Sequence, residues 1–155
     1  IAVEGGKGRT TDNGTHVPLI ANWKGKIKPS QISRELVDFS DFFPTLCEVA
    51  DVKIDSNIDL DGVSFYSELI GKKGRKKEWI HTWYNRDGGS NPKEQSKEWV
   101  RNEKYKLYVG NRFYNVVEDP NEKNPIKQKD MSQIERRIYI NFTEALRTYL
   151  SYRRE

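Results

Sequence analysis

The second half of the chain alternates short strand-like stretches with turns and then ends in one amphipathic helix, and this order limits the possible folds most strongly. Residues with strand character occupy four stretches, 79–84, 99–101, 105–109 and 113–117. Gly110-Asn111 separates the last two stretches and is typical of a tight hairpin turn. The pattern therefore predicts a small four-stranded antiparallel sheet.

The helix predicted after these strands has a clear start and a clear apolar stripe. Ser132 and Glu135 have the spacing of a capping box, in which each side chain bonds the other residue's backbone N–H. Apolar residues then recur every four positions, at Ile134, Ile138, Phe142, Leu146 and Leu150. We expect a helix over 132–152 that lays Ile138, Phe142 and Leu146 on the sheet, which makes this half an α+β subdomain.

The first half predicts a different organisation, with one strand and two helices. A short apolar strand is expected at 17–23, a helix from about 41 to 50, and a short helix or turn at 64–70. The basic stretch 71–77, GKKGRKK, is the best candidate for a solvated linker. These patterns predict two parts, 1–75 and 76–155.

Composition limits the classes of protein further. The chain of 155 residues holds 12% aromatic residues, which argues against global disorder. Its net charge of +4 is spread among interleaved carboxylates, so a nucleic-acid partner is not expected. No apolar run approaches about 18 residues, so no membrane span is expected. The single cysteine allows no internal disulfide, and the opening Ile-Ala-Val-Glu favours a fragment or a processed product.

A glycine-lined lysine near the start is the strongest candidate for chemistry. Lys7 stands in Gly5-Gly6-Lys7-Gly8, shortly before the predicted strand. Glycines let a bulky anion approach the backbone, and a lysine ammonium suits a sulfate or phosphate oxygen. We therefore expect an anion site at Lys7. A solvated loop lysine is the alternative interpretation.

Four segments, in order, carry a family resemblance. They are GGKG (5–8) with GTHVP (14–18), DFFPTL (41–46), DGVSF (61–65) with LIG (69–71), and the stretch from KYKLY (104–108) through FYNV (113–116) to DPNE (119–122). Together they resemble the C-terminal portion of the sulfatase family, within the alkaline phosphatase superfamily. The resemblance covers nearly the whole chain, although family members are several times longer. Lys24, where the family usually has proline before Gly25, departs from the pattern and leaves the substrate class open.

The resemblance implies a fold and an activity. The first part would be the closing edge of an α/β catalytic domain, followed by the α+β subdomain. The parent protein would be a hydrolase that cleaves sulfate esters, with carbohydrate sulfates among the candidate substrates, Lys7 catalytic and His16 binding substrate. The family uses calcium and a formylglycine made within Cys/Ser-x-Pro-x-Arg. That motif is absent here, and Cys47 lacks its Pro and Arg. Formylglycine and the calcium ligands are thus expected outside this chain, in the N-terminal catalytic portion of the same parent.

Several other residues have plainer interpretations. Asp12-Asn13-Gly14 resembles a metal-binding pair, but it follows the lysine segment where the family pattern places the pair before it, so a turn is expected. His81 is expected to be structural, and Trp79 and Trp83 to pack in a core rather than stack on sugars. The fragment alone is expected to be inactive. Family resemblance alone suggests a periplasmic, secreted or lysosomal location.

Two other functions remain open from the sequence. One is a phosphodiesterase or phosphonate hydrolase of the same superfamily, whose pocket would accept a phosphoryl group. The other is a non-catalytic module that binds a sulfated glycan through basic residues and tryptophans, and salt-dependent binding would distinguish it.

Overall fold

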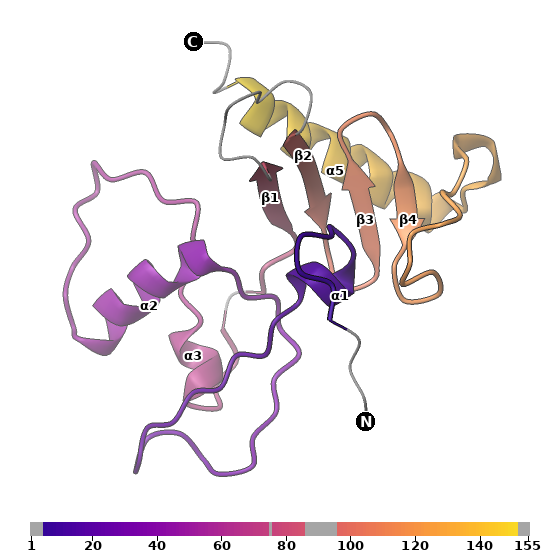
Figure 1. Cartoon of the computed structure of the whole chain (residues 1–155). Coiled ribbons are helices and arrows are strands. Elements are labelled where there is room, and N and C mark those ends of the chain that lie inside the picture. The colour runs from indigo at the N-terminus through magenta and orange to yellow at the C-terminus, as the bar shows by residue number, and fades with distance from the viewer. Residues whose placement is uncertain (1–4, 75, 86–95, 152–155) are drawn as a thin grey trace. The chain divides into compact units, whose positions relative to one another are not determined.

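The computed structural model describes residues 5–74, 76–85 and 96–151 and divides the chain into two compact units (Figure 1). The first unit combines residues 1–17 with 81–155, and the second comprises residues 18–80. The junction at 80/81 lies close to the expected boundary at 75/76. Residues 5–17, however, belong to the same unit as the C-terminal half.

The first unit is built on a four-stranded sheet in the order β1-β2-β3-β4 (Figure 1). Its strands are β1 (Ile80–Asn85), β2 (Ser96–Arg101), β3 (Tyr105–Tyr108) and β4 (Phe113–Asn115). The pairs β2–β3 and β3–β4 are antiparallel, with Leu107 opposite Phe113. At the hairpin turn Gly110 and Asn111 have φ of 93° and 66°, the left-handed region that these residue types tolerate best. The predicted sheet is confirmed.

One face of the sheet is covered by the long helix α5 (Gln133–Ser151). The capping box is present, because Glu135 N donates to Ser132 Oγ at 3.3 Å and Ser132 N donates to Glu135 Oε2 at 2.8 Å. Phe142 is 1% exposed and meets Phe113 edge to face. Ile134, at the start of the apolar stripe, is 70% exposed instead, because the stripe reaches the sheet only from about Ile138 onward.

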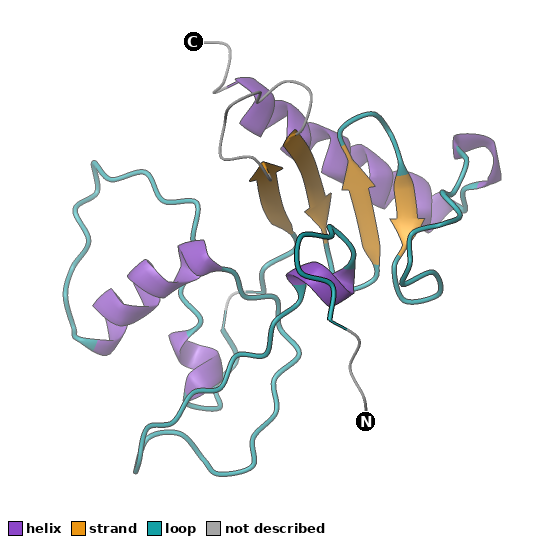
Figure 2. Cartoon of the chain, in the orientation of Figure 1, coloured by secondary structure: helices purple, strands orange, loops and turns teal. Residues whose placement is uncertain are grey.

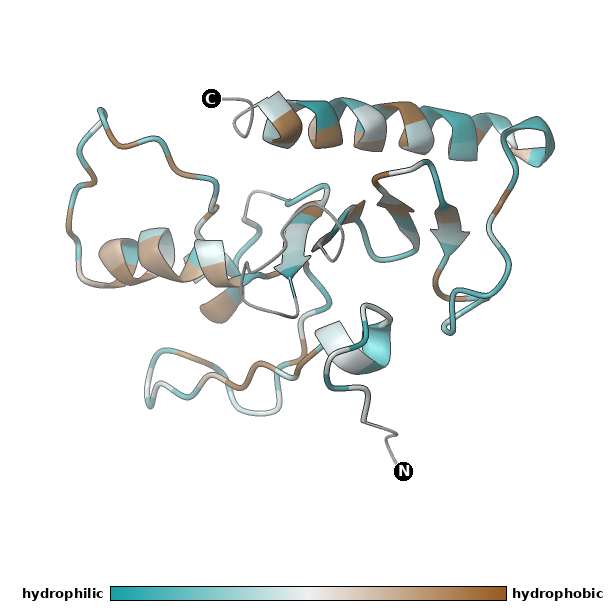
Figure 3. Cartoon of the chain, turned by 45° about the horizontal axis from the view of Figure 1, so that its top comes forward, coloured by the Kyte–Doolittle hydropathy of each residue, from teal (hydrophilic) through white to brown (hydrophobic). Residues whose placement is uncertain are grey.

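The other face of the sheet carries a second, aromatic core. Trp99, Tyr108, Tyr114 and Val116 are buried there, with Tyr84 packed against them. Residues 5–16, including the short helix α1 (Asp12–Thr15), lie on this face, opposite α5 (Figure 3). The unit therefore has three layers, with the N-terminal segment as the third.

The second unit contains mostly loops around two helices (Figure 2). Its elements are the 3₁₀ turn η1 (Phe39–Asp41), α2 (Phe42–Val49) and α3 (Tyr66–Leu69). Both helices were predicted, and Pro44 lies in the first turn of α2, where no intrahelical N–H bond is lost. The strand predicted at 17–23 is wrong, since these residues form no strand and Ile20 is 88% exposed. A strand needs a neighbouring strand to pair with its backbone groups, and an apolar run alone does not supply one.

Asp41 ties the second unit together. Its carboxylate accepts hydrogen bonds from Val63 N at 2.7 Å and Asp38 N at 2.9 Å, and it pairs with Lys77 Nζ at 2.7 Å. Lys77, which also pairs with Asp38 at 2.8 Å, is only 12% exposed. The expectation of a fully solvated linker at 71–77 is therefore wrong at Lys77, because two carboxylates draw its ammonium inward.

Among the described residues, no helix is both long enough and apolar enough to cross a bilayer. A 3₁₀ turn, η2 (Gln128–Asp130), precedes α5. The polar stretch between β1 and β2, at 86–95, and the predicted helix end at residue 152 lie outside the described residues.

Candidate functional site

Lys7 projects from a tight turn over residues 6–9. Arg9 N donates to Gly6 O at 2.8 Å, which closes the turn, and Gly8 has φ of 82° at its third position. Only glycine adopts this conformation without strain. The Lys7 side chain is exposed. The sequence prediction of an accessible lysine held in a glycine frame agrees with this geometry.

The turn packs directly against α1 through two glycines. A Cβ atom on Gly14 would lie 2.4 Å from both Gly6 O and Arg9 O, and one on Gly6 would lie 2.6 Å from Asn13 Cγ. At Gly14 backbone therefore meets backbone with no space for a side chain, and at Gly6 the Asn13 side chain fills the space that a Cβ atom would need. The Lys7 turn and α1 form one closely packed piece.

Asp12 and His16, the other candidates in this segment, have different surroundings. The Asp12 carboxylate pairs with the Arg101 guanidinium of β2. Through this ion pair Asp12 holds α1 on the sheet. His16 lies just past the end of α1, where its N–H donates to Asp12 O at 2.8 Å, and its side chain is exposed. Lys7 and His16 therefore belong to the same N-terminal segment, and both are exposed.

A buried polar cluster lies directly beneath this segment, and the sequence analysis missed it. Lys106 Nζ pairs with Glu122 Oε1 at 2.8 Å and donates to Thr10 O. The Tyr108 hydroxyl lies 2.5 Å from Glu122 Oε2 and 3.0 Å from Thr10 Oγ1. Burial lowers the pKa of Lys106 although Glu122 opposes this, and burial together with the Glu122 hydrogen bond raises the pKa of Tyr108. The signal available was the position of Lys106 on the same strand face as Tyr108.

The described residues do not fit a calcium site. Within them no group of three or more His, Cys, Asp or Glu side chains is placed to hold a metal ion, and Asp12 is engaged by Arg101. Cys47 is a free, half-buried thiol of α2. His81 pairs with Glu98 at 2.8 Å and stacks on Tyr149, so its expected structural role agrees with its contacts.

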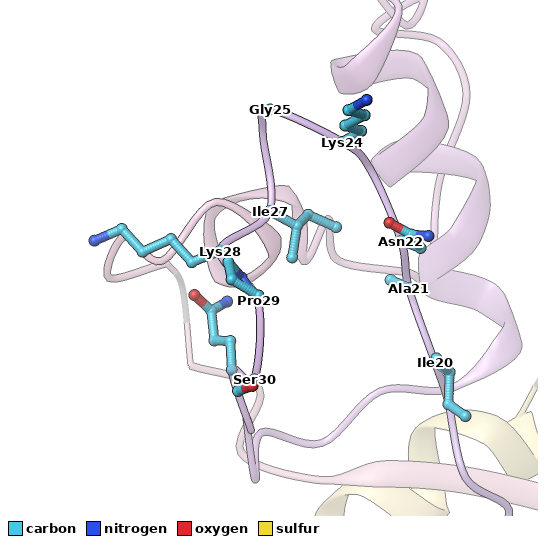
Figure 4. Close-up of a pocket in the computed structure, with 10 residues that line it drawn as sticks. Ile20, Ala21, Asn22, Lys24, Gly25, Ile27, Lys28, Pro29 and Ser30 are labelled. Atoms are coloured by element: carbon cyan, nitrogen blue, oxygen red, sulfur yellow. The ribbon is translucent and has the colours of Figure 1, made fainter.

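A hollow of about 530 Å³ lies in the second unit, within the loop over residues 20–31. Two passes of the chain wall it, and Ile27 points between them while Lys24 and Lys28 extend away (Figure 4). Its charged side chains therefore do not converge on a ligand. The hollow has no feature of an anion site.

Comparison with known families identifies the class of protein, the C-terminal portion of a sulfatase. Residues 7–148 match the family described as N-sulphoglucosamine sulphohydrolase, C-terminal. The chain belongs to this sulfatase family.

Individual relatives agree with this assignment. The chain is 38% identical over 82 residues to the uncharacterized sulfatase YdeN of Escherichia coli strain K12, covering 53% of this chain and 14% of that protein. It is 31% identical over 113 residues to an ulvan-active sulfatase of Formosa agariphila, covering 73% of this chain and 22% of that protein. The alignments thus span less than a quarter of either relative.

A solved structure shares the fold. It is described as BT4656 in complex with its substrate D-glucosamine-2-N,6-O-disulfate, and it superposes with a TM-score of 0.54 at 18% identity. The match covers 72% of this chain and 24% of that one. At this identity the likeness shows the fold alone.

Proposed function

We propose that this chain acts as the C-terminal portion of a sulfuric ester hydrolase and that Lys7 binds the sulfuryl group there. The observation that carries the proposal is the exposed ammonium on a turn that Gly8 and the Gly6–Gly14 contact hold in place. Membership of the sulfatase family supports it.

Lys7 would act on charge that develops during the reaction. Cleavage of a sulfate ester places negative charge on the bridging and peripheral oxygens of the sulfuryl group. A fixed ammonium stabilises that charge more than it stabilises the ground state, so it raises kcat as well as affinity. His16, exposed at the end of the same segment, would bind substrate as a hydrogen-bond donor.

The proposed substrate is a carbohydrate sulfate. The matching family is described by N-sulphoglucosamine, one relative is named for activity on ulvan, and the structural neighbour is described with a sulfated glucosamine. Each statement concerns another protein. Together they support a sulfated sugar as the substrate.

The proposed partner is the remainder of the catalytic domain. Val17, Leu19 and Ile20 are 64%, 49% and 88% exposed, so the segment predicted as a strand offers apolar side chains to a neighbouring sheet. Because the formylglycine motif is absent from the chain, that remainder would also supply the nucleophile. It would supply the calcium ligands as well.

The test is Lys7→Ala in the full-length sulfatase, assayed with p-nitrophenyl sulfate and with glucosamine N-sulfate. We expect kcat to fall by about 10²-fold or more, since one preorganised electrostatic donor is lost, with a smaller change in KM. Arg9→Ala is the matched control, because it removes a cation from the same turn, and only a small change is expected.

Unchanged steady-state kinetics in Lys7→Ala would refute the role of Lys7. Faster turnover of p-nitrophenyl phosphate than of the sulfate by the unmodified protein would instead favour a phosphoryl hydrolase. Salt-sensitive binding of a sulfated glycan without any turnover would favour a non-catalytic module.

A further inference from the structure

A fully buried lysine lies in the middle of the sheet, and the proposed chemistry does not use it. Lys106, on β3, has a side-chain exposure of 0%, and Glu122, its partner, is 6% exposed. Lysine is almost never buried this far without compensation, because removing an ammonium from water is costly. The groups that compensate its charge therefore indicate what the residue does.

Those groups converge on Thr10. The Lys106 ammonium donates to the Thr10 carbonyl and pairs with Glu122 Oε1 at 2.8 Å. The Tyr108 hydroxyl lies 3.0 Å from Thr10 Oγ1 and 2.5 Å from the second oxygen of Glu122. Both carboxylate oxygens of Glu122 are thus engaged, as are the carbonyl and the hydroxyl of Thr10, which is 8% exposed. The cluster fixes the backbone and the side chain of one residue.

Thr10 directly follows the turn that carries Lys7. Arg9, its neighbour, closes that turn on Gly6, and Asp12 on the other side is paired with Arg101. The Lys7 turn is therefore held on the sheet at two points, one a buried ammonium under a backbone carbonyl and the other an ion pair. The ammonium also lies over the Trp99 and Tyr108 rings, at 4.7 and 4.9 Å from their centroids, which limits its freedom further.

We propose that Lys106, with Glu122 and Tyr108, positions Lys7 for sulfate binding. The inference rests on the proposed function of Lys7. Apolar side chains of similar volume would stabilise a sheet face at least as well as a buried ion pair. A buried donor aimed at one carbonyl adds directional placement, and catalysis by a fixed charge requires such placement.

The first experiment measures the anchor itself in the 155-residue chain by amide hydrogen exchange. Lys106→Met removes the ammonium and keeps the apolar stem. Lys106→Met/Glu122→Gln also neutralises the carboxylate, so that no unpaired charge stays buried if the single variant fails to fold. We expect the Arg9 and Gly14 amides to lose about tenfold or more of their protection, while amides of β3 and β4 keep theirs.

Lys104→Met is the matched control. Lys104 lies two residues away, is 50% exposed and pairs with Glu118 at 3.7 Å, so its loss should leave the turn protected. Equal amide protection of the turn in the wild type and in the double variant would show that Lys106 does not anchor the turn. A uniform loss of amide protection across the turn and the sheet would show that Lys106 only stabilises the unit as a whole. That result would also contradict a specific anchoring of the Lys7 turn.

The second experiment is a double-mutant cycle on kcat in the full-length sulfatase, with p-nitrophenyl sulfate as the probe. Lys106→Met/Glu122→Gln is expected to lower kcat by about tenfold or more with KM less affected. In that background Lys7→Ala should cost less than it does alone, because the lysine is already misplaced. If the losses in kcat were additive, only the positioning role of Lys106 would be contradicted. A normal kcat in Lys7→Ala would instead contradict the proposed function of Lys7. In that case the hydrogen-exchange experiment would still test whether Lys106 anchors the turn.

Discussion

Asp38, at the start of the second unit's helices, shows how one carboxylate couples this fold to pH. Burial alone would raise its pKa, but hydrogen bonds from Lys77 and Ser40 outweigh burial and hold the pKa of Asp38 below its ordinary value of 3.8. A carboxyl whose pKa is lower in the folded state stabilises the fold above its unfolded pKa. That stabilisation is lost as pH falls through the lower, folded value.

We therefore expect the free energy of unfolding of the second unit to fall below about pH 4, and to fall less steeply in Lys77→Met. At neutral pH, Lys77→Met should itself destabilise this unit by about 3 kcal/mol, because Asp41, 1% exposed, loses its partner. Urea unfolding at a series of pH values measures both effects. Lys72→Met is the control, because Lys72 is an exposed lysine nearby. Equal losses of unfolding free energy in the two variants would contradict a stabilising role of the buried pair between Lys77 and Asp41.

At the scale of the element, α5 owes its place to a few buried residues. Phe142, Ala145 and Leu146 are the buried members of the helix, and Phe142 also meets Phe113 of β4. The capping box sets where the helix begins, whereas packing decides which part of its stripe reaches the sheet. The two contributions can be separated by mutation.

Phe142→Ala is expected to lower the free energy of unfolding by about 3–5 kcal/mol, since it removes a buried ring and leaves a cavity. Ile134→Ala is the matched control, because Ile134 belongs to the same periodic stripe but is 70% exposed, and a change within about 0.5 kcal/mol is expected. Chemical denaturation followed by circular dichroism measures both variants. Similar losses for the two would show that helix propensity, not contact with the sheet, holds α5.

At the scale of the whole molecule, the chain carries the proposed anion-binding lysine but no Cys/Ser-x-Pro-x-Arg motif. Its described residues hold no cluster of metal ligands, and the carboxylate most similar to a metal ligand, Asp12, is paired with Arg101. The remaining parts of a sulfatase site would come from a different segment of the protein.

We accordingly expect the 155-residue chain to bind no calcium tightly and to hydrolyse no sulfate ester on its own. Isothermal titration calorimetry with calcium chloride tests the first expectation, and turnover of p-nitrophenyl sulfate tests the second. Tight calcium binding that disappears in Asp12→Ala would show that Asp12 is a ligand after all.

Local patterns in the sequence determined the elements of the second half. The hairpin turn, the capping box and the alternation of the strands depend on neighbours only a few residues apart, and the structure contains all of them. The GGKG segment likewise predicted an accessible lysine on a glycine turn, and Lys7 lies on such a turn. Its role, like that of His16, is still a prediction.

Only the tertiary structure decided which charges are buried and which apolar residues are exposed. Lys106 contacts Thr10 across 96 residues of sequence, and Lys77 contacts Asp41 across 36. Burial of an ammonium depends on such distant partners, so two lysines that look solvated in the sequence are central to the two units. The strand expected at 17–23 is not formed, because an apolar run becomes a strand only where its backbone pairs with another strand, and the structure assigns residues 17–23 to no strand.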